Sequence, residues 1–314
     1  MLGRVAAIAL NTYRESLRAR ILLGLMGVAF AVAFYSIIVG SYTLRSATRV
    51  VSDLGTASIS VFGILTAIVI SSTSLYRELE QKTLFPILAR PIHRAEYLVG
   101  KYLGTLLTVA VFVMADAGLV LMLCAGLSPK TGALVLSGVL PRLAIVLAGS
   151  GLIAWRFPKA ITYGPIPWSV LMLVAGVAFS SVTPEDQRVV LAGSFLAFLE
   201  IAIVAAFGTL FSSFSTPFLS ALLTAGVILI GRNADLLAQL PAKYFGQGIH
   251  QGGVLLSRVV PNLHVYVPPR PLLTGEAAGE PLASYLAMGS VASLAWSVGL
   301  LAVASFLFRK RDFL

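Results

Sequence analysis

Long apolar runs constrain the fold of this chain more than any other feature. The clearest runs in the first half are Ile21–Tyr42, Thr56–Leu75 and Leu98–Leu127. Each has at least the roughly 20 residues that a helix needs to cross a hydrocarbon core of roughly 30 Å. The runs are continuous rather than alternating, and helices satisfy the backbone within each segment. The sequence therefore predicts an all-α, polytopic integral membrane helix bundle. Only 11% of the residues are charged, against about 25% in soluble domains.

The second half adds crossings and one ambiguity. Three further crossings are clear: Val189–Ser212, Pro217–Ile230 and Leu282–Phe308. The middle of the chain holds Ala133–Trp155, which Pro141 interrupts, and Pro165–Val182. Counting this pair as a hairpin predicts eight transmembrane helices. Six helices, with the hairpin re-entrant or interfacial, is the alternative. With either count, residues 1–314 form a single transmembrane domain whose two termini lie on the same side.

Residues 1–20 predict an amphipathic helix before the first crossing. Arg4, Arg14 and Arg18 fall on one face of it, whereas Val5 and Ala9 fall on another. Such a helix is able to lie in the headgroup region of the membrane. We expect an interfacial helix here rather than an extension of the first crossing.

The distribution of positive charge predicts the orientation. With eight crossings, one side carries most of the basic residues: Arg4, Arg14, Arg18, Arg20, Arg77, Lys82, Arg90, Arg94, Lys101, Arg156, Lys159, Arg309, Lys310 and Arg311. Basic loops remain in the cytoplasm, so both termini are expected there, in a multi-pass protein of the cell membrane. Residues 231–281 then form an extracytoplasmic loop. This asymmetry explains the net charge of +10 without nucleic-acid binding.

A charged island, residues 76–96, separates the second and third apolar runs. It has the sequence YRELEQKTLFPILARPIHRAE, with Glu78 and Lys82 at helical i,i+4 spacing. Pro91 disfavours a helical conformation at the residue before it. Leu84 and Phe85 are apolar side chains that this arrangement places on the water side. Exposed apolar residues of this kind indicate a partner surface.

The sequence contains no recognisable catalytic or metal motif. Its histidines, His93, His250 and His264, lack the spacing of metal ligands, and no phosphate-binding P-loop occurs. We therefore expect no cofactor in this chain; ATP, if it drives the protein, is hydrolysed by another chain. Two acidic residues, Asp116 and Glu200, lie inside apolar runs. Ionisable groups at that depth face protein or water, so they are candidates for a translocation path or for structural hydrogen bonds.

Four local patterns resemble the membrane subunits of type-2 ABC exporters, the ABC-2 permease family. The island and the residues after it, RELEQKTLFPILARPIHRAEYLVGKYLG, resemble the coupling-helix region of that family. FGTLFSSFSTPFLSALLT resembles its tight cytoplasmic link between two late helices. PNLHVYVPPRPLLTG resembles its outer segment before the last helix, and FRKRDFL its basic ending. The similarity is weakest over residues 127–187, where the extra hairpin departs from a six-helix pattern.

The resemblance implies half of an ATP-driven exporter. A second permease subunit, identical or not, would face this one, with cytoplasmic ATPase subunits that bind ATP and magnesium below. The 76–96 segment would couple the two parts. The residues it assigns to ATPase contact are Arg77, Glu78, Glu80, Lys82 and Arg90, with Leu84 and Phe85 as apolar anchors.

An ion-coupled secondary transporter is the competing hypothesis. It would use Asp116 and Glu200 as its ionisable groups. Inverted repeats and helices broken near their midpoints are typical of that class. No repeat is visible in the sequence, although Pro141 breaks one apolar run.

Overall fold

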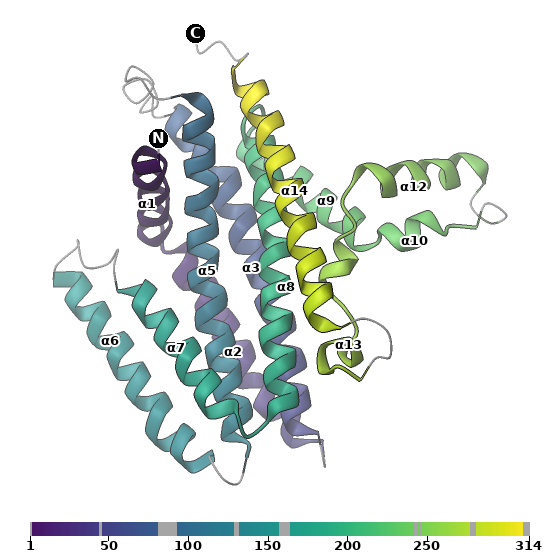
Figure 1. Cartoon of the computed structure of the whole chain (residues 1–314). Helices are drawn as coiled ribbons and strands as arrows, with labels where there is room; N and C mark the ends of the chain where they lie inside the picture. The colour runs from purple at the N-terminus through teal and green to yellow at the C-terminus, as the bar shows by residue number, and fades with distance from the viewer. Residues whose placement is uncertain are drawn as a thin grey trace.

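The computed structural model describes residues 2–43, 46–80, 93–128, 132–156, 164–241, 244, 246–276 and 281–309. Within these ranges every regular element is a helix, as the apolar runs predicted (Figure 1). The longer helices are α1 (Leu2–Arg18), α2 (Ile21–Ser41), α3 (Ala47–Glu80), α5 (Arg94–Gly126), α6 (Leu140–Arg156), α7 (Pro165–Ser180), α8 (Pro184–Ser212), α9 (Pro217–Arg232), α12 (Gln247–Val259) and α14 (Leu282–Arg309). The shorter elements are η1 (Leu134–Val139), α10 (Ala234–Ala238), η3 (Leu263–Tyr266) and α13 (Arg270–Thr274).

Five helices of the described chain are long and apolar enough to cross a membrane. They contain the spans Leu22–Ser41, Ala47–Ser74, Arg94–Gly126, Pro184–Ser212 and Leu282–Phe308. The other three predicted crossings also fold as helices, but α7 and α9 are only 16 residues long. An all-α polytopic bundle is thus observed, whereas the total of eight or six crossings stays a prediction.

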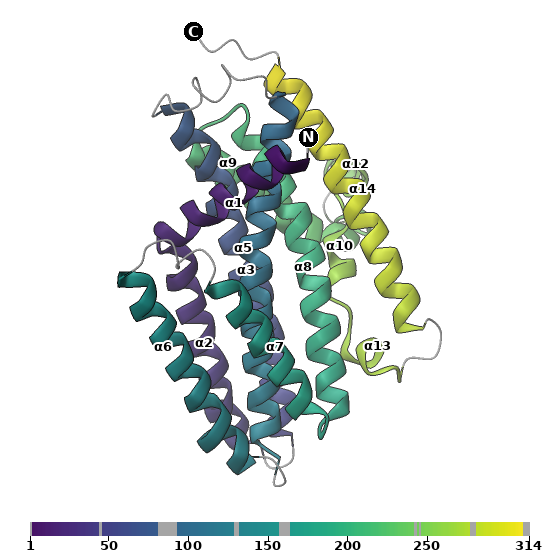
Figure 2. The same ribbon diagram turned by 60° about the vertical axis from the view of Figure 1, so that its left-hand side comes forward.

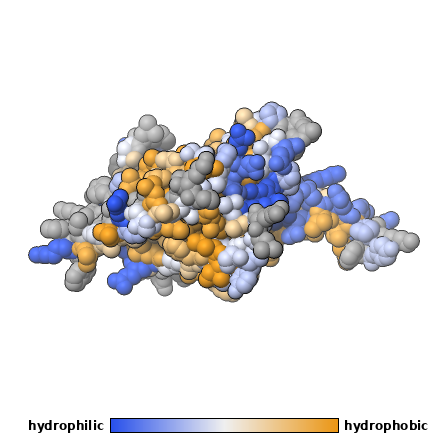
Figure 3. Space-filling model, turned by 90° about the horizontal axis from the view of Figure 1, so that it is seen from below, coloured by the Kyte–Doolittle hydropathy of each residue, from blue (hydrophilic) through white to orange (hydrophobic). Residues whose placement is uncertain are grey.

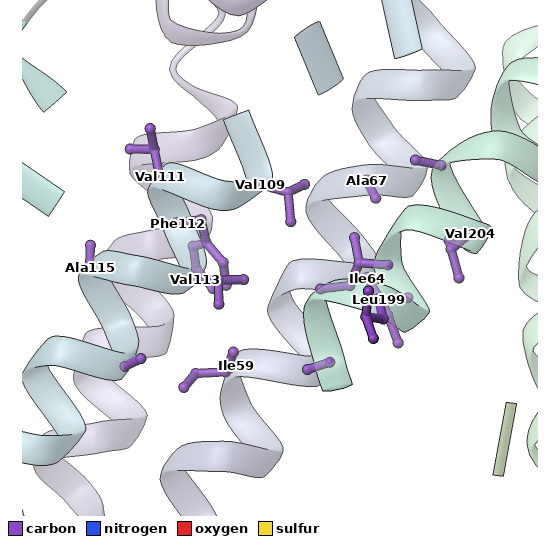
Figure 4. Close-up of a cluster of buried hydrophobic side chains, with 14 of the residues drawn as sticks. Ile59, Ile64, Ala67, Val109, Val111, Phe112, Val113, Ala115, Leu199 and Val204 are labelled. Atoms are coloured by element: carbon purple, nitrogen blue, oxygen red, sulfur yellow. The ribbon is translucent and has the colours of Figure 1, made fainter. Parts of the chain in front are cut away.

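The centre of the bundle is built from α3, α5 and α8. Apolar side chains of these helices interdigitate, and the ones labelled in Figure 4 include Ile59, Phe112 and Leu199. Small residues let the helices approach closely: a Cβ added at Gly193 of α8 would lie 2.5 Å from the Thr56 side chain of α3. Close contact through small residues drives helix association in a membrane, where lipid is as apolar as the core.

Prolines set several helix boundaries. Pro165, Pro184 and Pro217 each begin a helix, where the missing N–H group carries no penalty. Pro141 lies inside a helical segment instead, and the π-helical η1 directly precedes it. Because proline cannot donate to the carbonyl one turn earlier, a local change of helix type accommodates it. The predicted interruption at Pro141 therefore appears as a change of helix type rather than as a break.

The extra hairpin of α6 and α7 lies along one side of the bundle (Figures 1 and 2). Its inner helix, α7, packs on α5 at the crossing of Gly118 and Gly176. A Cβ added at Gly118 would lie 2.4 Å from the backbone carbonyl of Met172. The two backbones are thus in direct contact at this crossing.

Gly118→Ala is expected to lower the free energy of unfolding by about 1–3 kcal/mol, since the extra methyl overpacks a backbone contact that cannot yield. Gly27→Ala is the matched control, because the space beside Gly27 is open; this exchange is expected to be neutral or slightly stabilising. Denaturation in detergent micelles, followed by tryptophan fluorescence, measures both. Equal stability of the two variants would contradict the close packing of α7 on α5.

The boundaries around the charged island differ from the predicted ones. The helix α3 begins at Ala47, so Asp53 lies within it rather than in a connection, and α3 runs without a break to Glu80. The helix α5 begins at Arg94, four residues before the predicted start of the crossing. Both helices continue through polar residues beyond the apolar runs. The end of a helix is set by its backbone hydrogen bonds, whereas the prediction followed the hydrophobicity of the side chains.

Residues 231–281 form structured elements rather than an open loop. The helices α10 and α12 project away from the bundle (Figure 1). The following η3 and α13 return to pack on α8. Leu263 is fully buried, and the Tyr266 hydroxyl donates to the carbonyl of Gly289 on α14 at 3.0 Å. The part of this segment from η3 to α13 therefore belongs to the packed body of the protein, whereas α10 and α12 project from it (Figure 1).

The start of α1 and the end of α14 lie at the same end of the bundle (Figures 1 and 2). The end of α3 and the start of α5, which flank the island, lie there as well. Seen from the opposite end, hydrophilic residues gather over one part of the surface, and apolar residues cover much of the rest (Figure 3).

Candidate functional site

The helix α1 crosses α5 at the end of the bundle that holds the island (Figure 2). Two glycines of α5 allow this approach; a Cβ added at Gly104 would lie 2.5 Å from the carbonyl oxygen of Ala9. Tyr13 and Leu17 bury the apolar face of α1 in the contact. Residues Leu2–Arg18 are thus helical, and Tyr13 and Leu17 of this helix are buried by protein, whereas an interfacial position of the helix stays a prediction.

A buried lysine joins three helices beside the island. Its side chain, Lys101 of α5, is 5% exposed, and its Nζ lies 2.8 Å from the Ser74 hydroxyl of α3 and 3.4 Å from the Glu15 carboxylate of α1. A buried ammonium group is costly unless it is paired, so these contacts hold the three helices together. We call Glu15, Ser74 and Lys101 the coupling junction.

Other contacts tie the start of α5 to its neighbours. Arg94 donates to the carbonyl of Phe308 at 3.0 Å, and the ring of Phe308 stacks on that of Tyr97. The buried carboxylate of Glu96 lies 3.9 Å from the Arg4 guanidinium of α1. The helix that follows the island is therefore fixed to α1 on one side and to α14 on the other.

The structure describes some of the predicted coupling residues and not others. Arg77, Glu78 and Glu80 lie in the last turns of α3. The other predicted coupling residues lie outside the described ranges: Lys82, Leu84, Phe85 and Arg90. Ser74 and Lys101, which flank the island in the sequence, are brought into direct contact.

A second polar cluster lies inside the bundle around Glu200. The carboxylate is fully buried and forms a bidentate ion pair with Arg232, whose Nε and Nη2 lie 2.7 and 2.9 Å from its oxygens. Arg232 also donates to the hydroxyl of Ser60 on α3 at 2.6 Å. Such planar pairing is the strongest that a carboxylate makes with a side chain. Glu200, a candidate from the sequence, is thus held between α3, α8 and α9.

A third cluster surrounds Arg270 at the start of α13. Its guanidinium contacts Ser52 and Asp53 of α3 and Asp186 of α8. Burial lowers the pKa of Arg270, but its bonds with Asp186 and Asp53 raise it by more, so the net shift is upward. The cation therefore fastens the segment after η3 across the ends of two core helices.

The two arginine clusters border one pocket of about 230 Å³. Its walls come from α3, α8 and the segment around η3 and α13, and they include Thr56, Gly193 and Tyr266. The pocket is of mixed character, with Arg232 and Arg270 in its lining. It is a candidate part of a translocation path.

Asp116, the other acidic candidate, lies apart from these clusters on α5. Both carboxylate oxygens are buried without a hydrogen-bond partner in the described chain. The hydroxyl of Ser58, which donates to the carbonyl of Gly55, is its polar neighbour. Asp116 is thus a buried acidic group without an ion-pair partner among the described residues.

Sequence reasoning missed the partners of the acidic groups. It placed Arg232 and Arg270 in an extracytoplasmic loop, because both lie between the last two predicted crossings. For Arg232 the available signal was the shortness of the apolar run Pro217–Ile230, which at about 1.5 Å per residue falls short of a roughly 30 Å core. No group of three or more His, Cys, Asp and Glu residues that suits a metal ion occurs among the described residues.

Comparison with known proteins identifies the family. The family model for ABC-2 family transporter proteins matches residues 6–313. The search of curated proteins finds no match. The match spans the coupling junction, both arginine clusters and the extra hairpin, and the five long apolar helices suit a multi-pass membrane protein. This chain therefore belongs to the ABC-2 family of transporter proteins, the membrane permeases of ABC transporters.

Proposed function

We propose that this chain is the permease subunit of an ATP-driven exporter and is coupled to a separate ATPase through residues 76–96. The observation that carries the proposal is the coupling junction. Both ends of the island continue into long helices of the core, and Lys101 joins these helices to each other and to α1. A force applied to the island would therefore reach α1, α3 and α5 together.

The proposed mechanism requires different contacts in two states. ATP and magnesium bind in the ATPase, and closure of the ATPase pair changes its contact with the island. An effector shifts a conformational equilibrium only by the difference in its free energy of interaction with the two states. Arg77, Glu78, Glu80, Lys82 and Arg90 would supply the polar part of that difference.

Leu84 and Phe85 would anchor the island in an apolar groove of the ATPase. A second permease subunit, identical or different, would complete the path, and lipid of the cell membrane would surround the pair. Both termini would be cytoplasmic, and residues 231–281 would face the other side. The substrate would leave on that outer side.

Ion-coupled transport is the second candidate function, and the unpaired carboxylate of Asp116 is the observation that favours it. Glu200 supports it less, since protonation would leave the Arg232 guanidinium without its partner. Uptake of protons by the purified chain under a pH gradient, lost in Asp116→Asn, would support this candidate. Dependence of transport on ATP alone would exclude it.

Glu78→Lys combined with Glu80→Lys is expected to reduce the amount of co-purified ATPase about tenfold or more. Reversing two charges turns attraction into repulsion at the proposed contact, and like charges placed opposite each other at an interface cost several kcal/mol. The measurement is affinity purification of the tagged chain from its native membrane, with mass spectrometry of the bound proteins.

Glu185→Lys combined with Glu276→Lys is the matched control. It makes the same charge change at exposed residues outside the island and is expected to retain the ATPase. Equal loss in both pairs, or no ATPase with the wild-type chain under mild crosslinking, would refute the coupling proposal.

A further inference from the structure

A groove separate from the polar pocket lies between α5, α7 and α8. Its volume is about 390 Å³, within the roughly 300–1,000 Å³ of small-molecule sites. Val113 and Met114 form one wall, Leu173 another, and Phe195 and Phe198 a third. The helices α7 and α8 converge at the turn that joins them and separate toward the other end (Figures 1 and 2). The extra hairpin thus builds one side of this groove.

Among the described residues that line the groove, Ser194 alone has a polar hydrogen-bonding side chain. It is 5% exposed, and its hydroxyl has no hydrogen-bond partner among the described residues. Thr105, Thr108 and Thr209, on the same helices, each donate to the carbonyl four residues earlier. Burying a hydroxyl without a hydrogen-bond partner costs about 1–3 kcal/mol of folding free energy. The groove therefore offers an unused hydrogen-bond donor within apolar walls.

The surroundings of the groove decide what can enter it. Phe195, which lines the groove, is an exposed apolar residue of α8, and α5 and α8 are candidate membrane spans. A site with this rim opens to hydrocarbon, so its occupant comes from the bilayer. A charged ligand would lack a partner, because no lining side chain is ionisable.

We infer that the groove binds a lipophilic molecule from the membrane that carries an oxygen acceptor within an apolar body, such as a ketone or an ether. The apolar walls enclose the body, and Ser194 donates its hydroxyl hydrogen to the oxygen. This site does not depend on the ATPase contact. Its failure would leave the proposed coupling function intact.

The test compares two probes of equal chain length: caprylone, a linear ketone with a central carbonyl, and pentadecane, the corresponding alkane. The full-length chain in detergent micelles is incubated with each probe and separated by gel filtration, and the retained probe is quantified by mass spectrometry. We expect the wild type to retain about tenfold more caprylone, the factor that corresponds to about 1.4 kcal/mol for one hydrogen bond.

Two variants locate the binding. Ser194→Ala is expected to reduce caprylone to the level of pentadecane and to leave pentadecane unchanged. Ala110→Phe, which fills the groove from its half-exposed side, is expected to remove both probes. Ala31→Phe adds the same ring to an exposed position of α2 and is expected to behave as the wild type.

Equal retention of the two probes by the wild type would overturn the inference, because the groove would then hold ordinary lipid hydrocarbon. Retention of caprylone that Ser194→Ala and Ala110→Phe leave unchanged would overturn it as well. Ser194→Ala removes a single oxygen atom and is expected to fold, so the ketone preference stays measurable if Ala110→Phe does not fold.

Discussion

Glu200→Leu is expected to lower the free energy of unfolding by about 1–3 kcal/mol, the cost of leaving a partly buried polar group without its hydrogen-bond partner. The reason is the Arg232 guanidinium, which donates to both oxygens of Glu200 and to Ser60. Without the carboxylate, the Arg232 cation, whose side chain is 31% exposed, keeps only the Ser60 hydroxyl of these partners. Denaturation of the purified chain in mixed micelles, followed by tryptophan fluorescence, measures the change.

The double variant Glu200→Leu with Arg232→Leu separates the ion pair from the individual side chains. Apolar replacement of both partners of a buried pair is often neutral or stabilising, so the double variant is expected to recover most of the loss. A double variant as unstable as Glu200→Leu would show that Arg232 is not the relevant partner. The same conclusion would follow if the stability losses of Glu200→Leu and Arg232→Leu simply added in the double variant.

Lys101→Met is expected to uncouple ATP hydrolysis from the membrane helices without releasing the ATPase. Methionine keeps the apolar stem of the side chain but loses the contacts with Ser74 and Glu15. A hydrogen bond to a charged group contributes about 1.5–3 kcal/mol, so stimulation of hydrolysis by the permease is expected to fall about tenfold or more. ATP hydrolysis by the complex in lipid nanodiscs measures this effect.

Two variants control that experiment. Arg18→Met removes a cation from an exposed position of α1 and is expected to leave stimulation unchanged. Lys101→Arg keeps a cation at the junction and is expected to restore part of it. Loss of the ATPase itself from Lys101→Met would contradict the account, because the junction is proposed to transmit force rather than to bind the partner.

The class of fold was predictable from the sequence because hydrophobicity alone specifies membrane helices. The predicted crossing Ile21–Tyr42 corresponds to α2, and Leu98–Leu127 corresponds to α5, which begins four residues earlier and ends at Gly126. The predicted boundaries were wrong where polar residues continue a helix, as in the first turns of α3. The packing of residues 261–274 on the bundle was not predicted, since Leu263 and Tyr266 become buried only through contacts with distant helices.

The candidate site was only partly accessible from the sequence. The pattern of the island identified its ends, and the apolar surroundings of Glu200 marked it as unusual. The partners of these residues are remote in the chain: Lys101 contacts Glu15 of α1, and Arg270 contacts Asp53 of α3. Helix periodicity contains no information about which helices pack together, so these pairs required the structure.

The measurement that tests the central claim most directly is photo-crosslinking from the island in the native membrane. A benzoylphenylalanine replaces Phe85 in one sample and Tyr244, an exposed aromatic residue outside the island, in the other. The account predicts a crosslinked product with a P-loop ATPase from Phe85 and none from Tyr244. A chain that yields no ATPase product from Phe85, or equal product from both positions, would contradict coupling through residues 76–96.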